Sequence, residues 1–254
     1  MEIFDSHCHL DFEVFDGDRL EIIEECKALG IQHILLPGIT AATWPRLISL
    51  AESDAMFFSA LGLHPYFIQQ HSIDHIALLE KYLAEKNVSA IGEIGLDYHL
   101  PDLDRDEQKS FFIKQLTIAK NADFPVILHV RKAHDEVLQQ LRKFKLCGGI
   151  VHAFSGSEQQ ANQYIDLGFK LGFGGSVTYE RASKLRHLVK TLPLESIVLE
   201  TDAPDMPPEK YHQQRNSPVY ILDILGVIAE LREESVQQIV RTTTQSALNV
   251  LRRI

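Results

Sequence analysis

Short apolar runs alternate with longer amphipathic segments from one end of the chain to the other. The runs contain few polar positions, which is typical of strands that are covered on both faces in a parallel sheet. Their ends follow one another about every 28 residues, the spacing of repeated β/α units. The pattern predicts eight strands, at Ile3–His9, His33–Gly38, Phe57–His64, Ser89–Asp97, Pro125–Val130, Gly149–Phe154, Phe169–Gly175 and Ser196–Asp202.

Helix start and stop signals lie between these runs. Asp16–Asp18 precedes an apolar stripe as an N-cap would, and Gly30 follows it as a C-terminal stop. Ser157–Gln160 has the pattern of a capping box, ahead of a helix that reaches Leu167. Further helical segments are expected at about Val219–Leu231 and Glu234–Leu251.

The number of units and the chain length favour a closed barrel. A (β/α)₈ TIM barrel typically needs about 250 residues, and this chain has 254. A doubly wound open sheet has the same alternation and is the alternative. Polar residues end both the first and the last predicted strand, and a closed ring would bring these strands side by side. We therefore expect one TIM-barrel domain over residues 1–254, with the irregular stretch Ala203–Pro218 as an active-site loop.

The amino-acid composition indicates the class of protein and its expected location in the cell. Hydrophobic residues make up 45% of the chain and charged residues 24%, as in ordinary globular proteins. The cysteines Cys8, Cys26 and Cys147 have no CxxC spacing, which argues against a disulfide framework or a thiolate zinc site. The N-terminal segment does not resemble a signal peptide, and no apolar run approaches the length of a membrane span. We expect a soluble, cytoplasmic protein with no membrane partner.

The net charge is −10, from 25 basic and 35 acidic residues. An acidic chain is not expected to coat long nucleic acids through a broad basic face. A nuclease stays possible if metal ions or a few Arg and Lys side chains bind the phosphates. The charge therefore favours a small or short-chain phosphoester substrate, such as a single-stranded DNA end.

Candidate metal ligands begin at the first predicted strand. His7 and His9 are two residues apart, so alternation places them on one face, although such a pair alone is as often structural. Glu93 lies in an apolar, glycine-rich strand, where a buried carboxylate needs a cation or several donors. A salt bridge with an arginine is the alternative. Asp97 points to the same side and suits the role of acceptor for a ligand histidine.

Three more strands end in potential ligands. A lone histidine at the end of a buried strand is more often a core residue, but His129 and His152 follow adjacent strands at the same depth. Asp202 ends the last strand, with Glu200 two residues deeper on the same side. Imidazole and carboxylate ligands suit zinc, manganese or magnesium. The six candidates exceed one tetrahedral site, whereas two divalent cations would use a bridging carboxylate such as Glu93.

These residues lie in motifs that resemble those of the TatD family of metal-dependent hydrolases, several of which are deoxyribonucleases related to the amidohydrolase superfamily. The resemblance spans essentially the whole chain, and within the family it extends to the bacterial YjjV-type branch. The matching motifs are DSHCHLD (Asp5–Asp11), GLHP (Gly62–Pro65), IGEIGLDY (Ile91–Tyr98), HVR (His129–Arg131), HAFSG (His152–Gly156), LETDAP (Leu199–Pro204) and RNSP (Arg215–Pro218).

The resemblance implies a division of the ligands between two ions. One ion would be held by His7, His9, Glu93 and Asp202, and the other by Glu93, His129 and His152. In the wider amidohydrolase superfamily a modified lysine often bridges the metals, and Glu93 takes that place here. The implied reaction is metal-assisted hydrolysis of a phosphodiester, with Asp202 orienting the attacking water or accepting its proton.

Further site residues are expected around the metals. His64 precedes a proline at the end of a strand and serves either phosphate binding and proton transfer or the loop itself. Arg131 contacts a substrate phosphate or forms a surface salt bridge, and Asn216 binds substrate or orders its loop. Two other functions compete with the nuclease: an ester or amide hydrolase such as an aminoacyl-tRNA deacylase, and a non-catalytic metal-binding protein.

Overall fold

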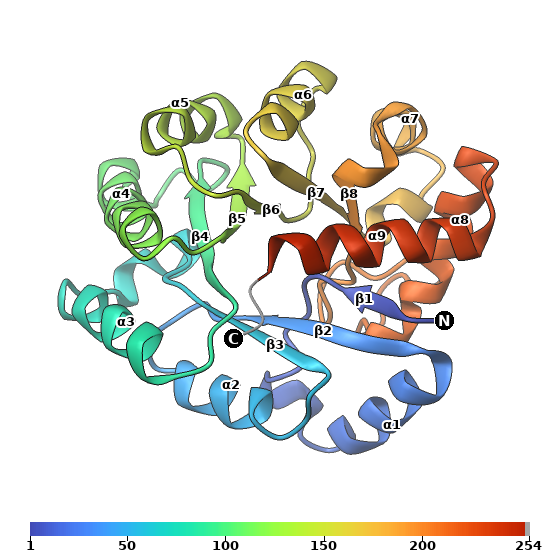
Figure 1. Ribbon diagram of the computed structural model, residues 1–254, viewed down its shortest axis with the longest axis horizontal. Helices are drawn as coiled ribbons and strands as arrows, with labels where there is room; N and C mark the ends of the chain where they lie inside the picture. The colour runs from blue at the N-terminus through green and yellow to red at the C-terminus, as the bar shows by residue number, and fades with distance from the viewer. Residues whose placement is uncertain (252–254) are drawn as a thin grey trace.

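Eight parallel strands form one sheet in chain order, β1 to β8, in the computed structural model, which describes residues 1–251 (Figure 1). Backbone hydrogen bonds between the ends of the first and last strands and the residues after them nearly close the ring, among them Ser6 N–H to Leu199 O, 2.9 Å, and Asp202 N–H to His7 O, 2.8 Å. The expected TIM barrel is confirmed. Its strands are β1 Ile3–Asp5, β2 Ile31–Pro37, β3 Phe57–Leu61, β4 Ala90–Asp97, β5 Val126–Arg131, β6 Gly149–Val151, β7 Phe169–Phe173 and β8 Ile197–Leu199.

Six strands end earlier than the apolar pattern predicts, and four of them stop short of a candidate site residue. β1 stops before His7, β3 before His64, β6 before His152 and β8 before Asp202. Asp202 has φ 57° and the residue after His152 has φ 42°, both in the left-handed region, which a strand does not admit. Four candidate ligands, His7, His9, His152 and Asp202, therefore lie in the loops that follow the strands, whereas Glu93 and His129 lie within β4 and β5.

Helices pack around the outside of the ring. Gly30 ends α1 in the left-handed conformation, with φ 84°, and the capping box of Ser157 and Gln160 begins α6, both as expected. Asp18 occupies the N-cap of α1, but its carboxylate accepts from Arg215 and not from the helix. The helices of the described chain are α1 Arg19–Leu29, α2 Trp44–Ala51, α3 Asp74–Glu85, α4 Arg105–Ala122, α5 His134–Phe144, α6 Glu158–Asp166, α7 Ser183–Thr191, α8 Ile221–Arg232 and α9 Val236–Val250.

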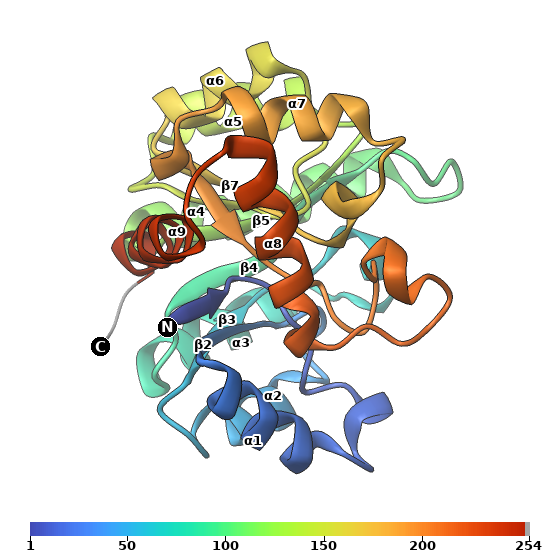
Figure 2. The same ribbon diagram turned by 90° about the vertical axis from the view of Figure 1, so that its right-hand side faces the viewer.

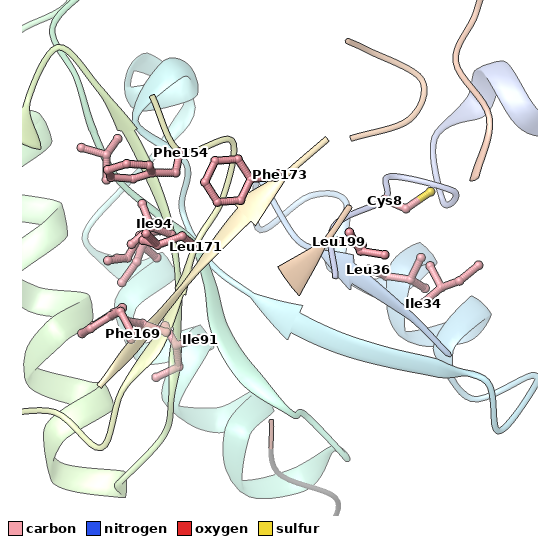
Figure 3. Close-up of a cluster of buried hydrophobic side chains, with 14 of the residues drawn as sticks. Cys8, Ile34, Leu36, Ile91, Ile94, Phe154, Phe169, Leu171, Phe173 and Leu199 are labelled. Atoms are coloured by element: carbon pink, nitrogen blue, oxygen red, sulfur yellow. The ribbon is translucent and has the colours of Figure 1, made fainter. Parts of the chain in front are cut away.

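The hydrophobic core has two layers. The outer layer fills the space between strands and helices, and Figure 3 shows part of it, from Phe169 and Phe173 of β7 to Ile34 of β2. The inner layer fills the ring itself with side chains from the strands, including Phe4, Leu35, Phe58, Ile127, Ile150 and Val198.

The last helix covers the inner layer from below. Ala247 of α9 packs against the inner layer, as does Leu251 just beyond it. Thr244 Oγ1 donates to the carbonyl of Glu2, and Ser246 Oγ donates to that of Glu195, each at 2.8 Å. Figure 2 shows α9 on one side of the barrel and the loop that follows β8 on the other. Within residues 1–251 no helix is long and apolar enough to cross a membrane.

Candidate metal centre

The six predicted ligands come together at the C-terminal ends of the strands. Five of them line a cavity of about 670 Å³, and the sixth, His7, lies fully buried beneath it. His7 and His9 follow β1, Glu93 lies in β4, and Asp202 follows β8. This is the end of the barrel at which TIM-barrel enzymes carry their active sites.

Four donor atoms surround one point at the floor of this cavity. His7 Nε2 lies 3.1 Å from Glu93 Oε2 and 3.7 Å from Asp202 Oδ1. His9 Nε2 lies 3.9 Å from the same Glu93 oxygen and 3.8 Å from the same Asp202 oxygen. Two donors that each lie about 2.1 Å from one ion are about 3.0–3.6 Å apart at bond angles of 90–120°. The four atoms are therefore spaced almost as ligands of one cation.

Both carboxylates divide their oxygens between neighbours. Glu93 Oε2 faces His7 and His9, whereas Glu93 Oε1 lies 3.1 Å from His129 Nδ1. Asp202 Oδ1 faces the same pair, whereas its Oδ2 lies 3.6 Å from His152 Nε2. A carboxylate with one oxygen on each side is the geometry that a bridge between two cations requires.

Unpartnered buried nitrogens support the fit to a cation. His7 Nε2 is fully buried and has no hydrogen bond, although Glu93 Oε2 is only 3.1 Å away. Neither nitrogen of the His7 ring has a hydrogen-bond partner, and His9 Nδ1 also lacks one. Buried polar atoms without partners are costly. A divalent cation between the donors would give His7 Nε2 a partner, so these residues fit such an ion.

The electrostatics of His7, His9 and Asp202 point the same way. Burial, reinforced by the charge of His152, holds the pKa of His7 well below its usual range, and burial lowers the pKa of His9 to about 4. Both rings are therefore neutral, as ligands must be. Burial raises the pKa of Asp202 to about 8 against the attraction of His152, and Glu93 and Glu200 add to the rise. Bound cations would offset the repulsion among these three carboxylates.

His129 is held in the orientation of a ligand. Its Nε2 lies 2.9 Å from Asp97 Oδ2 and its Nδ1 lies 3.1 Å from Glu93 Oε1, and these two carboxylates raise the pKa of His129 against the effect of burial. With a cation bound, Nε2 would donate to Asp97 and Nδ1 would be free to bind the ion. The structure thus gives Asp97 the contact that the sequence predicts. Three hydrogen bonds in turn hold Asp97: its backbone N–H donates to Gln108 Oε1, its carbonyl accepts from Gln108 Nε2, and its Oδ1 accepts from His99 N–H.

His152 has a different set of neighbours. Its ring stacks on that of His7 with 3.6 Å between centroids, and its Nδ1 lies 3.1 Å from Glu200 Oε1. Donor atoms within 4.8 Å of one another form three groups of potential ligands. The resemblance assigns His129 and His152 to one ion, whereas these groups separate them. The groups are His7, Glu93 and His152; His7, His9 and Asp202; and His64, Glu93 and His129.

His64 lies beside the ligands but is arranged as a donor. Its Nδ1 accepts the backbone N–H of Tyr66 at 3.0 Å, so in the neutral ring Nε2 carries the proton. That Nε2 lies 3.3 Å from Glu93 Oε1 and lines the cavity. Burial lowers the pKa of His64, which keeps the ring neutral. A protonated nitrogen binds no metal, and this N–H group has Glu93 Oε1 as its neighbour.

The two predicted substrate contacts lie in different surroundings. Arg131 is exposed at the end of β5 and lines the cavity. Asn216 is fully buried, and its amide donates to the carbonyls of Thr201 and Asp205 at 2.8 and 2.6 Å. Its oxygen accepts from Ser217 N–H, so the Asn216 side chain orders the loop after β8 and does not line the cavity.

One buried pair beneath the site was missed by the sequence reasoning. Asp5 Oδ1 accepts from the backbone N–H groups of Thr201, at 2.9 Å, and His7, at 3.3 Å. Its Oδ2 accepts from the Thr201 hydroxyl at 2.5 Å. This carboxylate ties the chain just before Asp202 to the chain just before His9. Asp5 continues the alternation of His7 and His9 backward into an apolar strand, a signal that could have identified it.

Comparisons with known proteins identify the family of this chain. The sequence model described as TatD related DNase matches residues 4–252. The uncharacterized metal-dependent hydrolase YjjV of Escherichia coli K12 is 41% identical over 238 residues, which cover 92% of each chain. The crystal structure of YjjV superposes with a TM-score of 0.94 over 98% of this chain and 97% of that one, at 38% identity.

Two more distant proteins extend the comparison. The 3'-5' ssDNA/RNA exonuclease TatD of a Rahnella strain is 31% identical over 253 residues, 96% of each chain. An uncharacterized amidohydrolase from Saccharomyces cerevisiae has a TM-score of 0.82 at 19% identity, over 98% of this chain and 99% of that one, which shows a shared fold. The expected family is confirmed: this chain belongs to the TatD-related DNase family of metal-dependent hydrolases.

Proposed function

We propose that this protein uses two divalent cations, zinc, magnesium or manganese, to hydrolyse phosphodiester bonds at the ends of short single-stranded DNA. The main observation behind this proposal is that two sets of donor atoms share Glu93, because one of its oxygens faces His7 and the other faces His129. The relative named a 3'-5' ssDNA/RNA exonuclease supports a nucleic acid substrate.

The residues of the chain divide the chemical work. His7, His9, Glu93 and Asp202 would hold one ion, and Glu93 with His129 and His152 the other. When bound, divalent ions supply Lewis acidity, which makes a water molecule a stronger acid and offsets negative charge on the phosphoryl group.

Asp202 is the proton acceptor. Its side chain is 13% exposed, against 3% for Glu93 and 1% for Glu200, so it is the carboxylate that water reaches most easily. It orients the water and takes its proton while the water oxygen forms a bond to phosphorus. The ester P–O bond breaks, and the departing oxygen takes a proton from solvent.

His64 binds the phosphoryl oxygen. The residue lines the cavity with its Nε2 3.3 Å from Glu93 Oε1, and the hydrogen bond from Tyr66 holds the ring in the tautomer that donates. A neutral donor beside the reacting group stabilises negative charge without competing for a cation. Arg131, at the exposed end of β5, contacts a phosphate farther out.

The size of the cavity favours the end of a chain. Its volume of about 670 Å³ lies within the range of small-molecule sites, about 300–1,000 Å³. A net charge of −10 leaves little general attraction for polyanions, so binding depends on the few phosphates near the cavity. The affinity should therefore depend only modestly on salt. The logarithm of the binding constant should fall with the logarithm of the salt concentration with a slope of about −0.7 per phosphate contact on a single strand.

The test compares substrates and variants of the metal-reconstituted protein. We expect wild type to shorten a labelled single-stranded oligonucleotide from its end and to leave a carboxyl ester and an amide intact. Asp202→Asn should lose at least about a hundredfold in kcat because a carboxylate ligand and proton acceptor is removed. Asp74→Asn, at an exposed position in α3, is the matched control and should keep full activity.

Two outcomes would contradict the proposal. Cleavage of the carboxyl ester or amide, with every phosphodiester left intact, would replace the nuclease by an ester or amide hydrolase on the same metals. Full activity of Asp202→Asn at equal metal content would refute the role of Asp202, and elemental analysis of both proteins provides that comparison.

A further inference from the structure

A second, smaller cavity adjoins the candidate active site. It has a volume of about 250 Å³ and lies between the loop after β6 and the start of α7. Ser155 and Leu185 line both this cavity and the larger one. The two cavities therefore lie side by side, within reach of one bound strand that passes over Ser155 and Leu185.

Two positively charged side chains, Arg181 and Lys184, line the second cavity. Arg181 and Lys184 are both exposed, and within residues 1–251 no carboxylate lies within 4.0 Å of the charged nitrogens of either side chain. Other cations of this acidic chain have such partners, among them Arg215 with Asp18 and Lys109 with Glu136. Arg181 and Lys184 therefore offer positive charge that no ion pair neutralises.

Contacts hold both side chains near the cavity. Lys184 Nζ donates to the carbonyl of Ser155 at 3.3 Å, which directs the ammonium toward the wall shared with the larger cavity. Its two other N–H groups stay available. The Arg181 guanidinium lies over the ring of Tyr179, 5.1 Å from its centroid, which limits the positions that this long side chain adopts.

We propose that this second cavity binds the next phosphate of a nucleic acid strand whose end lies at the metal centre. Arg181 and Lys184 donate to the oxygens of one phosphodiester, a ligand that suits both a planar guanidinium and an ammonium. Leu185, half-buried between the cavities, packs against the sugar that links the two phosphates. The preferred substrate is then an oligonucleotide with at least two phosphodiester groups.

This inference rests on the proposed function, and the experiment separates the two. The metal-loaded enzyme is given a dinucleotide with one phosphodiester and single-stranded DNA of four and six nucleotides. We expect kcat/KM of wild type to rise about tenfold or more from the dinucleotide to the tetranucleotide, mainly through KM. The increase from four to six nucleotides should be smaller.

The double variant Arg181→Ala/Lys184→Ala should abolish most of that rise and leave dinucleotide cleavage unchanged. Arg181→Lys/Lys184→Arg keeps both charges and should keep part of the preference. Lys81→Ala/Lys143→Ala removes two exposed cations that do not line either cavity, and it should behave as wild type. Anisotropy of a fluorescent tetranucleotide with the Asp202→Asn protein should show the same order in affinity.

The outcomes are distinguishable. If wild type cleaves no phosphodiester at all, the proposed function fails, and the second cavity loses its ligand with it. If wild type cleaves the dinucleotide and the tetranucleotide equally well, the nuclease stands and this inference is wrong. A length preference that persists unchanged in Arg181→Ala/Lys184→Ala would also overturn it.

Discussion

Replacing Thr201 by valine tests the buried connection beneath the metal centre. The change removes the hydroxyl that donates to Asp5 Oδ2 at 2.5 Å and keeps the shape of the side chain. Asp5 is fully buried, so Oδ2 would be left without this partner, whereas Oδ1 would keep its two backbone donors. An orphaned buried acceptor costs about 1–3 kcal/mol. For a chain of this length, 2 kcal/mol lowers Tm by about 4–8 °C.

The measurement is thermal unfolding of the metal-free proteins, followed by titration with a divalent cation. Thr201→Val should melt at the lower temperature and bind the cation about tenfold more weakly, because the chain leading to Asp202 is less firmly held. Thr201→Ser keeps the hydroxyl and should restore most of both properties. A Thr201→Val protein with the Tm and the cation affinity of wild type would refute the reasoning, and an equal loss in Thr201→Ser would assign the effect to the methyl group.

Three further changes test other parts of the structure. Glu93→Ala should reduce the content of both metal ions, since each oxygen of Glu93 faces a different donor group; elemental analysis that finds two ions in a folded variant would contradict the bridge. Ser157→Ala removes half of the capping box of α6 and should lower the free energy of unfolding by about 1 kcal/mol, measured by urea denaturation, with no change in metal content. Asn216→Ala should make the loop after β8 more susceptible to protease, because two carbonyls lose their amide donor; unchanged cleavage would show that other contacts suffice.

The periodic pattern of the chain was sufficient to predict the barrel and the gathering of the candidate ligands at one end of it. A parallel strand that is buried on both faces needs an unbroken apolar run, so each such run predicts a strand. A histidine in such a run, as at His129, is then easily recognised as a polar exception. The order of the strands then follows from the β/α repeat. Local sequence carries both kinds of information, because alternation and burial depend on near neighbours.

Contacts between distant parts of the chain could not be predicted in this way. Asp5 and Thr201 are 196 positions apart, and their pairing exists only once the ring brings the chain after β8 beside β1. The donor role of His64 depends on a backbone N–H group two residues later, whose direction the turn after β3 determines. Asn216 is buried because the loop after β8 folds back on itself, which its polar composition conceals.

The position of α9 has a consequence for turnover. Ala247 of this helix and Leu251 beyond it pack against the inner core. This end of the barrel is therefore covered, and the cavity lies at the opposite end, among the candidate ligands. A nucleic acid strand bound as proposed would then enter at the C-terminal ends of the strands, and each released fragment would leave by the same route. A fragment that stays bound in the cavity would block the next strand. The proposed nuclease should therefore show product inhibition, and it should dissociate from its substrate between successive cleavage events.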